Sequence, residues 1–428
     1  MERFFALRER GTTVRTEVLA GATTFLTMVY IVIVNPGIMA QAGIDQGAAF
    51  VATCLAAAIG SALMGLLANF PIALAPGMGL NAYFAFAVVL GMGVTWQVAL
   101  GAVFLSGLLF LAVSLLRVRE WLINGIPLSL KLGIAAGIGF FLGLIGLKNM
   151  GLVVDHPATL VGLGKLTETS VLLGCLGFVI IAGLSARRVP GAIVIGILAT
   201  AALGIPFGLT KFSGIVSLPP SLAPTFLQLD IAGALQLGVL GIVFTFFLVD
   251  LLDNTGTLIA TTHRAGLMRK DGSVPNLGRA LQADSGGAII GSALGTSTTV
   301  SYIESAAGIQ AGGRTGLTAL TAAVLFLAVL FLAPLATSIP AFATAPALVF
   351  VACLMAQALR DVAWDDATDY VPAVITTLSM PFTFSIATGI GLGFITHALL
   401  KVAAGRAAEV SGAVWIIAGL CVVKFALT

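Results

Sequence analysis

Apolar runs long enough to cross a lipid bilayer recur along nearly the whole of this 428-residue sequence. Hydrophobic residues make up 59% of the chain, charged residues make up 9%, and the mean hydropathy is +1.09. A run of about 20 apolar residues can span the hydrocarbon core as a helix, with its backbone groups paired internally. The length alone would suggest roughly two or three soluble domains. The composition instead predicts an all-α, polytopic membrane protein.

Hydropathy and turn signals predict about fourteen transmembrane segments. Their approximate ranges are 18–40, 49–69, 77–92, 96–117, 128–148, 170–186, 190–208, 232–260, 280–295, 299–312, 315–338, 343–359, 370–403 and 411–427. The range 370–403 is too long for one straight span and contains Pro372, Pro381 and several glycines. It is either one broken helix or two, so the number of spans is left open by one.

Basic residues indicate how the spans are oriented. They precede the first span and follow the fourth, sixth and eighth: Arg3, Arg8, Arg10, Arg15, Arg117, Arg119, Arg187, Arg188, Arg264, Arg269, Lys270 and Arg279. Cytoplasmic loops are enriched in arginine and lysine, whereas the opposite loops near 148–169 and 209–231 are only weakly charged. The pattern predicts a multi-pass protein of the cell's inner (plasma) membrane with both termini in the cytoplasm.

Common binding and catalytic motifs are missing from the sequence. The net charge of +3 and the lack of a basic tract argue against a nucleic-acid partner. The four cysteines stand singly in apolar stretches, without the spacing of a metal site. With no P-loop and no HExxH motif, the sequence gives no support to ATP-driven pumping, to a cofactor or metal centre, or to an enzyme. The pairs Gly133/Gly137 and Gly139/Gly143 have GxxxG spacing, which is typical of helix packing.

Two interrupted apolar segments suggest that the chain is built from two similar halves. The first runs from Pro71 to Asn81 and the second from Gly295 to Glu304, and each begins with residues unfavourable for a helix before it turns helical. Broken helices in corresponding positions mark the midplane site of transporters, because the N-termini of half-helices expose unpaired N–H groups. About seven spans in each half would give the halves opposite orientations, which predicts a seven-plus-seven inverted repeat.

Three carboxylates lie within these apolar segments. Asp250 and Asp253 share one face of a predicted helix, because they are three residues apart. Glu304 ends the second interrupted segment. A charge in hydrocarbon is costly, so an intramembrane acid normally faces a polar cavity and has a function there. The alternatives are a helix end at the membrane interface for the two aspartates and a structural ion pair with Arg314 for Glu304.

Polar uncharged residues accompany these acids. Asn81 has the place in the first interrupted segment that Glu304 has in the second. An asparagine in a membrane helix often only joins neighbouring helices, but this position favours a role in binding. Thr298, Thr299 and Ser301 either line a cavity or cap exposed backbone groups.

The segments around these residues resemble the nucleobase–cation symporter-2 (nucleobase/ascorbate transporter) superfamily, and most closely its AzgA-like branch of adenine/guanine/hypoxanthine permeases. The matching stretches are Ala20–Tyr30 with Asn35-Pro36, Ala75–Tyr83, Val249–Thr257 and Thr296–Gly308. They extend over essentially the whole chain in the family's order. The resemblance implies short strands at about 72–75 and 296–300, ahead of the two half-helices.

The resemblance also implies two domains, each assembled from both halves of the chain. The core domain would comprise residues 1–125, with spans 1–4, and residues 226–340, with spans 8–11. The gate domain would comprise residues 126–225, with spans 5–7, and residues 341–428, with spans 12–14. Transport would then be an elevator-type movement of the core against the gate, and the gate domain would form the contact of a possible homodimer.

Carried onto the matching positions, the resemblance assigns roles to individual residues. It implies substrate carboxylates at Asp250 and Glu304, the family's third-span asparagine at Asn81, and a coupling or helper carboxylate at Asp253. Tyr302 matches a position whose backbone lines the site of related uracil carriers. The expected substrate-binding set is Asp250, Glu304, Asn81, Tyr302, Thr299 and Ser301, and the expected proton-coupling set is Asp253, Asp250 and Glu304.

The activity implied by the resemblance is uptake of a purine nucleobase (guanine, hypoxanthine or adenine) by proton symport. A purine carries N–H groups on its edges, and carboxylates are strong acceptors for such donors. A buried carboxyl group that gains a proton outside and releases it inside would couple uptake to the proton gradient. Sodium coupling is an alternative, and so is an anion carrier or channel of the same fold, although two acids in the site disfavour an anion. The choice of Phe246, Phe247 or Tyr83 as a stacking partner for the base is left open.

Overall fold

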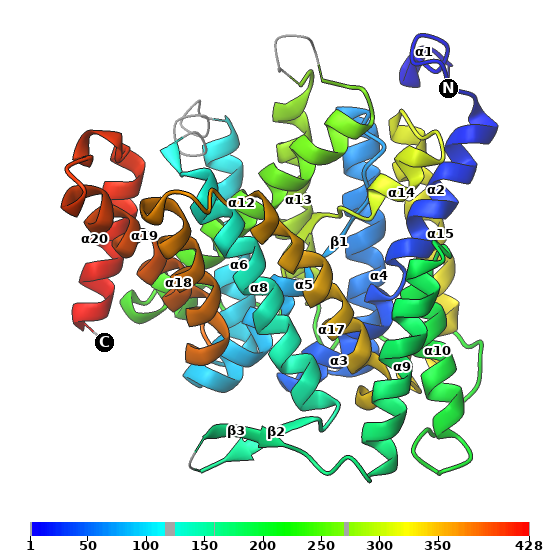
Figure 1. Cartoon of the computed structure of the whole chain (residues 1–428). Coiled ribbons are helices and arrows are strands. Elements are labelled where there is room, and N and C mark those ends of the chain that lie inside the picture. The colour runs from blue at the N-terminus through cyan, green and yellow to red at the C-terminus, as the bar shows by residue number, and fades with distance from the viewer. Residues whose placement is uncertain (1, 116–124, 158, 269–273, 428) are drawn as a thin grey trace.

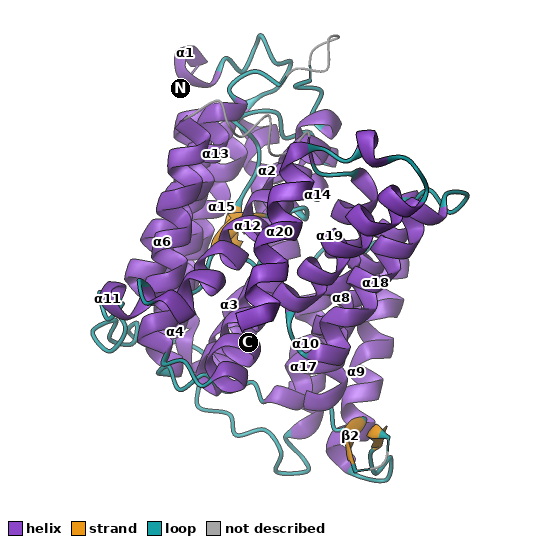
Figure 2. Ribbon diagram, turned by 90° about the vertical axis from the view of Figure 1, so that its left-hand side faces the viewer, coloured by secondary structure: helices purple, strands orange, loops and turns teal. Residues whose placement is uncertain are grey.

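The helices of the computed structural model run roughly side by side, as expected of a membrane protein (Figures 1 and 2). The structure describes residues 2–115, 125–157, 159–268 and 274–427, so the predicted cytoplasmic residues Arg117, Arg119, Arg269 and Lys270 lie outside it. Within these ranges, nine helices are long and apolar enough to span a bilayer. Shorter apolar helices cover Met78–Gly91, Ala192–Gly204 and Gly412–Val423. The predicted all-α, polytopic class is confirmed.

The first half of the chain forms, in order, α1 (Glu2–Phe5), α2 (Val14–Met28), α3 (Ile31–Gln41), α4 (Gln46–Leu63), η1 (Met64–Ala68), β1 (Leu74–Pro76), α5 (Met78–Ala82), η2 (Tyr83–Gly91), α6 (Trp96–Leu115), α8 (Leu128–Asn149), β2 (Val153–His156), β3 (Leu160–Leu163), α9 (Thr169–Ala186) and α10 (Ala192–Gly204). Side-chain caps set two of the helix starts. Thr13 accepts from the Thr16 N–H ahead of α2, and Asp45 accepts from the Ala48 N–H ahead of α4. The first two spans each consist of two consecutive helical elements, α2 with α3 and α4 with the π-helical η1.

The second half forms α11 (Ile231–Ala234), α12 (Leu237–Arg264), α13 (Leu277–Leu294), β4 (Thr299–Ser301), α14 (Ser305–Gln310), α15 (Gly316–Val329), η3 (Leu330–Leu332), α16 (Ala333–Thr337), α17 (Ala341–Ala356), η4 (Gln357–Asp361), α18 (Ala367–Thr383), α19 (Ile386–Ala403), η5 (Ala407–Glu409) and α20 (Gly412–Leu427). The range 370–403 therefore contains two helices. α18 stops at Phe384, whose φ of 51° is left-handed, and Ser385 then caps α19 by accepting from the Thr388 N–H.

The N-terminus lies at one end of the bundle, whereas α20 turns back after η5 and carries the C-terminus toward the other end (Figures 1 and 2). The sequence left open whether 370–403 forms one broken helix or two, and the structure has two, α18 and α19. The side of the membrane on which each terminus lies stays a prediction.

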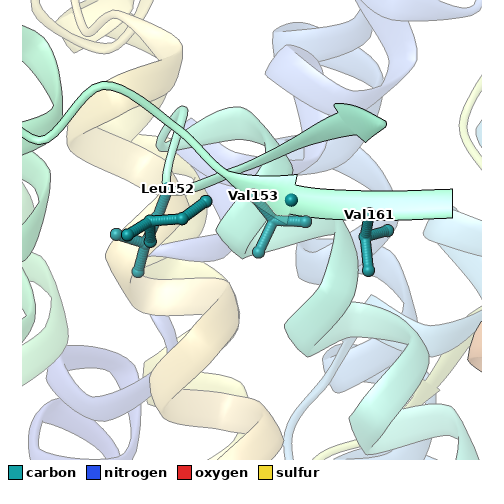
Figure 3. Close-up of a pocket in the computed structure, with 5 residues that line it drawn as sticks. Leu152, Val153 and Val161 are labelled. Carbon is teal, nitrogen blue, oxygen red and sulfur yellow. The ribbon is translucent and has the colours of Figure 1, made fainter. Parts of the chain in front are cut away.

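Two antiparallel ladders interrupt the helical bundle. β1 pairs with β4 inside it, and β2 pairs with β3 as a hairpin that lies at its end (Figures 1 and 2). The hairpin was not predicted from the sequence, which indicated only a loop near 148–169. An apolar cavity of about 370 Å³ lies against the hairpin and is lined by Leu152, Val153, Val161, Gly162 and Leu163 (Figure 3). None of these side chains is ionisable, so the chemistry of the intramembrane acids lies elsewhere.

Helix packing sorts the elements into two groups. In the first, α13 packs on α4 and α6, α15 packs on α2 and α4, and α12 packs on α6. In the second, α8 packs on α17 and α18, α9 packs on α10 and α17, and α19 packs on α18 and α20. The GxxxG pairs of α8 serve the second group, because Gly133 and Gly137 face α18 while Gly139 and Gly143 face α17. Contacts between the groups are sparser and include α5 with α8 and α12 with α19.

Candidate functional site

The two interrupted segments meet at the ladder inside the bundle (Figure 2). β1 and β4 are antiparallel, with Pro76 opposite Thr299, and the Gly77 N–H extends the ladder by donating to the Thr298 carbonyl at 2.9 Å. Each strand leads into a half-helix, β1 into α5 and β4 into α14. Because the strands are antiparallel, the two half-helices extend in opposite directions and turn their N-termini toward the ladder. The strands that the resemblance implied are present, a few residues later than expected.

Tyr302 fastens the two segments to each other. Its Oη donates to the Pro76 carbonyl at 2.5 Å, and its N–H donates to the Ala73 carbonyl at 3.0 Å. The Ala73 N–H in turn donates to Ser305 Oγ at 3.0 Å. Tyr302 is buried, and these bonds occupy both its hydroxyl and its N–H. Its place in the structure is at the predicted site, while the role of its backbone toward a substrate stays a prediction.

Asp250 lies on α12 and is fully buried. Its Oδ1 accepts a hydrogen bond from Asn254 Nδ2 at 2.6 Å, and Asn254 Oδ1 accepts from the Ser301 N–H at 2.8 Å. Asn254 therefore holds Asp250 against β4. Within the described ranges, Asp250 Oδ2 has no hydrogen-bond partner. A buried carboxylate oxygen is costly to leave unpaired, which marks this atom as a place for a ligand N–H or a proton.

Glu304 immediately precedes α14 and is half-buried. Its Oε1 accepts from Tyr30 Oη at 2.8 Å, and Tyr30 lies at the junction between α2 and α3. The Arg314 guanidinium is directed elsewhere, because its Nη1 donates to the carbonyls of Ile309 and Gly313, both at 2.7 Å. The alternative explanation of Glu304 as the partner of Arg314 in an ion pair is therefore wrong.

Asp253 differs from Asp250 in its surroundings although both lie on α12. Asp250 is fully buried, whereas Asp253 is exposed. The charge of Asp253 interacts with that of Glu304. α12 and the segment before α14 thus bring two carboxylates within electrostatic range of each other, and the Asp253 side chain is exposed at the surface of the protein.

A fourth acid, Asp284 on α13, was not among the predicted residues. It is fully buried, and its two carboxylate oxygens accept from Ser301 Oγ at 2.9 and 3.0 Å. Its charge interacts with those of Asp250 and Asp253. The argument that singled out Asp250, an acid inside a helix-length span, applies equally to Asp284 in the predicted span 280–295. Ser301, predicted to bind substrate, has its hydroxyl bonded to this acid.

Asn81 is buried in the first turn of α5, where its Oδ1 accepts from Ser297 Oγ. Its Nδ2 is 3.5 Å from the Pro76 carbonyl, which is too long for a strong hydrogen bond, so the amide keeps donor capacity beside the ladder. Thr299 is also buried, and its Oγ1 has no partner in the part of the chain that the structure describes. The Thr299 side chain faces α13 at Gly291.

The aromatic candidates for stacking on a ligand lie in different surroundings. Tyr83 and Phe246 pack edge to face, with ring centroids 5.0 Å apart and planes at 64°. Both are buried, and Phe247 belongs to a separate apolar cluster with Phe110 and Leu251. Tyr83 and Phe246 both belong to the large apolar core cluster. A stacking role for either ring stays a prediction.

The arrangement suits a neutral ligand that offers several N–H groups, or protons. Among the described residues, the hydrogen bonds to the carboxylates of Asp250, Glu304 and Asp284 come from neutral groups, which are Asn254, Tyr30 and Ser301 respectively. No three His, Cys, Asp or Glu side chains in those same ranges are placed to hold a metal ion together. The acids thus present acceptors without a cation to neutralise them.

Comparison with known proteins gives the family. Residues 15–392 match the model of the Permease family (Xan_ur_permease). The chain belongs to this family. The adenine permease AdeP of Escherichia coli K12 is 51% identical over 424 residues, which are 99% of this chain and 95% of AdeP. The guanine/hypoxanthine permease PbuG of Bacillus subtilis 168 is 46% identical over 422 residues, which are 96% of each chain.

The permease also shares its fold with a solved transporter structure. The transmembrane domain of the cyanobacterial bicarbonate transporter BicA superposes with a TM-score of 0.67 and 16% identity, covering 89% of this chain and 97% of BicA's domain. At that identity the likeness concerns the fold alone, and it confirms the predicted seven-plus-seven inverted repeat. The resemblance to the nucleobase transporter superfamily is likewise confirmed, and the permease is a multi-pass membrane transporter and not an enzyme.

Proposed function

We propose that this permease carries purine nucleobases (adenine, guanine or hypoxanthine) across the inner membrane of the cell. The observation that carries the proposal is Asp250 Oδ2, a fully buried acceptor with no hydrogen-bond partner among the residues that the structure describes, next to the ladder at which two half-helices meet. Relatives named as adenine permease and guanine/hypoxanthine permease support this class of substrate.

The chemistry of a purine matches the groups around the ladder. Its N–H donors would bond to the carboxylates of Asp250 and Glu304, because charged acceptors make the shorter and stronger hydrogen bonds. Asn81 Nδ2 would donate to a ring nitrogen or a carbonyl oxygen of the base. The hydroxyl groups of Thr299 and Ser301 and the backbone of Tyr302 complete the proposed binding set: Asp250, Glu304, Asn81, Tyr302, Thr299 and Ser301.

Proton symport is the proposed coupling, with Asp253, Asp250 and Glu304 as the exchanging groups. Two like charges within electrostatic range disfavour each other, so one proton shared between Asp253 and Glu304 would relieve their repulsion. Asp253 is exposed at the surface of the protein, which would give the proton a route to the site. Sodium coupling is the alternative, because carboxylates also bind that cation.

The two groups of helices support an elevator-type movement. We assign the first group to a core domain of residues 1–125 and 226–340 and the second to a gate domain of residues 126–225 and 341–428. Every proposed site residue lies in the core domain, and contacts between the groups are sparser than those within them. A core that slides against the gate would therefore carry the bound base across the membrane without dismantling the site.

Orientation and assembly complete the proposal. The exposed arginines before the first span and after α9 and α12 favour a cytoplasmic N-terminus. Exposed apolar side chains on α19 and α20, among them Leu399, Trp415, Ile416 and Leu420, face either lipid or a second copy of the gate domain. We propose a homodimer through this surface.

Uptake by purified permease in proteoliposomes tests the proposed function. An inward proton gradient should drive accumulation of labelled adenine or hypoxanthine, which a protonophore should abolish and removal of sodium should leave intact. Asp250→Asn should lose this uptake, while Asp155→Asn, on the exposed hairpin, should retain it as a matched control. Uptake of bicarbonate without uptake of any purine would show an anion carrier instead.

A further inference from the structure

Tyr30 lies at the junction between α2 and α3, and its phenol reaches the second half of the chain. The side chain is 1% exposed, and its Oη donates to Glu304 Oε1 at 2.8 Å. The neighbouring Thr27 Oγ1 lies 3.4 Å from the Glu304 carbonyl oxygen. Because 274 residues separate Tyr30 from Glu304 in sequence, the bond joins the first span to the second interrupted segment.

The other ionisable groups that face Glu304 do not offer it a positive charge. Asp253 faces it from α12, and Tyr302 faces it from the end of β4. The Arg314 guanidinium, beyond the end of α14, is bonded to backbone carbonyls. Glu304 therefore lies between a second acid and the buried donor of Tyr30. A hydrogen bond to an ionised carboxylate is stronger than one to a neutral carboxyl group, so the phenol favours the charged form against the repulsion of Asp253.

We propose that Tyr30 is a positioning residue that fixes Glu304 Oε1, aims Oε2 at the base and sets the pH range over which Glu304 exchanges its proton. This inference rests on the proposed function of the same site. The phenol uses one of the two lone pairs of Oε1 and restricts the approach to that oxygen, so Oε2 is the oxygen better placed to accept from a purine N–H. When Glu304 takes up a proton, it is a weaker acceptor and the link to the first span loosens.

The titration of Glu304 in substrate-free protein tests the link directly. Infrared spectra of the purified permease, recorded as the pH is lowered, should contain a protonated-carboxyl band that is missing in Glu304→Gln. Tyr30→Phe removes the hydroxyl and keeps the ring. It should leave more of Glu304 protonated at a given pH, by roughly tenfold in the ratio of the two forms, since one charge-assisted hydrogen bond is lost. Tyr370→Phe, whose ring stacks on Trp364 in the gate domain, serves as the matched control and should leave the band unchanged.

Binding of adenine and hypoxanthine then shows whether the link serves the substrate. Tyr30→Phe should weaken binding by about tenfold, which corresponds to ~1.4 kcal/mol, with little change in thermal unfolding. Unchanged binding of both bases in Tyr30→Phe would show that the link does not serve the substrate.

Two outcomes keep the inference separate from the proposed function. An unchanged Glu304 band in Tyr30→Phe would overturn the inference whatever the substrate is. If the wild-type permease binds no purine, the proposed function fails, while the infrared comparison still decides whether Tyr30 controls Glu304. If Tyr30→Phe unfolds, Thr27→Val replaces it as the test, because this variant keeps the phenol and removes only the neighbouring hydroxyl contact to Glu304. Thr27→Val should retain the wild-type infrared band. A band shifted as far as expected for loss of the phenol would contradict the inference.

Discussion

At the scale of single residues, the acids of the site differ in what they are bonded to. Within the described residues, Asp250 is held on one oxygen by Asn254 and its other oxygen has no hydrogen-bond partner, whereas the two oxygens of Asp284 share the hydroxyl of Ser301. Asp253 is exposed at the surface of the protein. A buried acceptor without a partner suits ligand binding, a buried acid held by a protein hydroxyl suits support of the site, and an exposed acid suits proton exchange.

Asp253→Asn tests the role of the exposed acid. The variant should keep appreciable binding of adenine or hypoxanthine but lose accumulation against a gradient, because the exchanging group is gone. The measurement is labelled uptake over a range of pH, which should become flat. A variant that loses binding outright and still accumulates substrate in response to pH would exchange the roles of Asp253 and Asp250.

Asp284→Ala and Asp284→Asn separate the structural hydrogen bond of Asp284 to Ser301 from the effect of its negative charge on transport. Alanine leaves the buried Ser301 hydroxyl unpaired, which should lower the free energy of unfolding by about 1–3 kcal/mol. Asparagine can keep one of the two bonds, so it should be closer to the wild type in thermal unfolding and still lose uptake because the charge is missing. Wild-type uptake by Asp284→Asn would show that this acid has no part in transport.

The sequence alone identified three acids of the site, because they lie within apolar segments. Asp250, Asp253 and Glu304 stood out because hydrocarbon disfavours charge, and the same rule would have found Asp284. The sequence could not predict the hydrogen-bond partner of Glu304, because only the folded chain brings Tyr30 next to a residue 274 positions away.

At the scale of elements, α12 and β4 are joined through a single side chain. Asn254 accepts from the Ser301 N–H and donates to Asp250 Oδ1, so it fixes the acid relative to the ladder. Asn254→Ala removes both bonds at once. It should lower the free energy of unfolding by about 2 kcal/mol and abolish base binding, because a buried N–H and a buried carboxylate oxygen lose their partner.

Thr255→Ala is the neighbouring control for that substitution. The Thr255 hydroxyl donates to the Leu251 carbonyl within α12, so its loss should leave binding intact. Thermal unfolding and a binding titration on the purified variants measure both effects. Unchanged binding in Asn254→Ala would contradict the assigned position of Asp250.

The loops that flank α18 and α19 carry a charge cluster with its own pH dependence. Arg406 Nη1 bonds Asp366 at 2.6 Å and Arg406 Nε bonds Glu409 at 2.7 Å. These bonds lower the pKa of Glu409 from 4.5 to about 2 and hold the pKa of Asp366 well below its usual range. A carboxyl group whose pKa is lower in the folded protein than in the unfolded protein stabilises the fold at any pH above its unfolded-state pKa. That stabilisation is lost as the pH falls toward and through the folded-state pKa.

The permease should therefore lose thermal stability between about pH 4.5 and pH 2, and Arg406→Ala should reduce that loss. The effect should be small, because the cluster is at the surface and is screened by salt. Melting curves across this pH range measure it, with Arg188→Ala, an exposed arginine at the end of α9, as the control. Equal slopes in wild type and Arg406→Ala would contradict the assignment.

Helices defined by the length of an apolar run were predicted well. Boundaries between elements that depend on a local turn of the backbone were predicted less well. α8 and α9 follow directly from their apolar runs. The prolines and glycines of 370–403 indicated a break, but its position depends on a left-handed Phe384, a residue with no preference for that conformation. The β2–β3 hairpin was missed because its strands of four residues are too short to stand out from a loop.

At the scale of the whole molecule, the site residues lie in one of the two groups of packed helices, the group that we propose as the core domain. The ladder, the half-helices and all four acids lie in that group, and α8 with its glycines lies in the group that we propose as the gate domain. Gly79 on α5 faces Ile138 on α8, where an added Cβ would lie within 2.3 Å of the Ile138 methyl group. α5 therefore approaches α8 closely at Gly79, a contact that would have to slide in the proposed elevator movement.

Equilibrium binding to the purified permease tests the central claim that buried acids of the core hold a purine base. Labelled adenine or hypoxanthine should bind the wild type with one site per chain, unlabelled purines should compete, and uracil should not. Asp250→Asn and Glu304→Gln should each abolish this binding while melting as folded proteins. Wild-type affinity in either variant, or tight uracil binding that no purine displaces, would contradict the account.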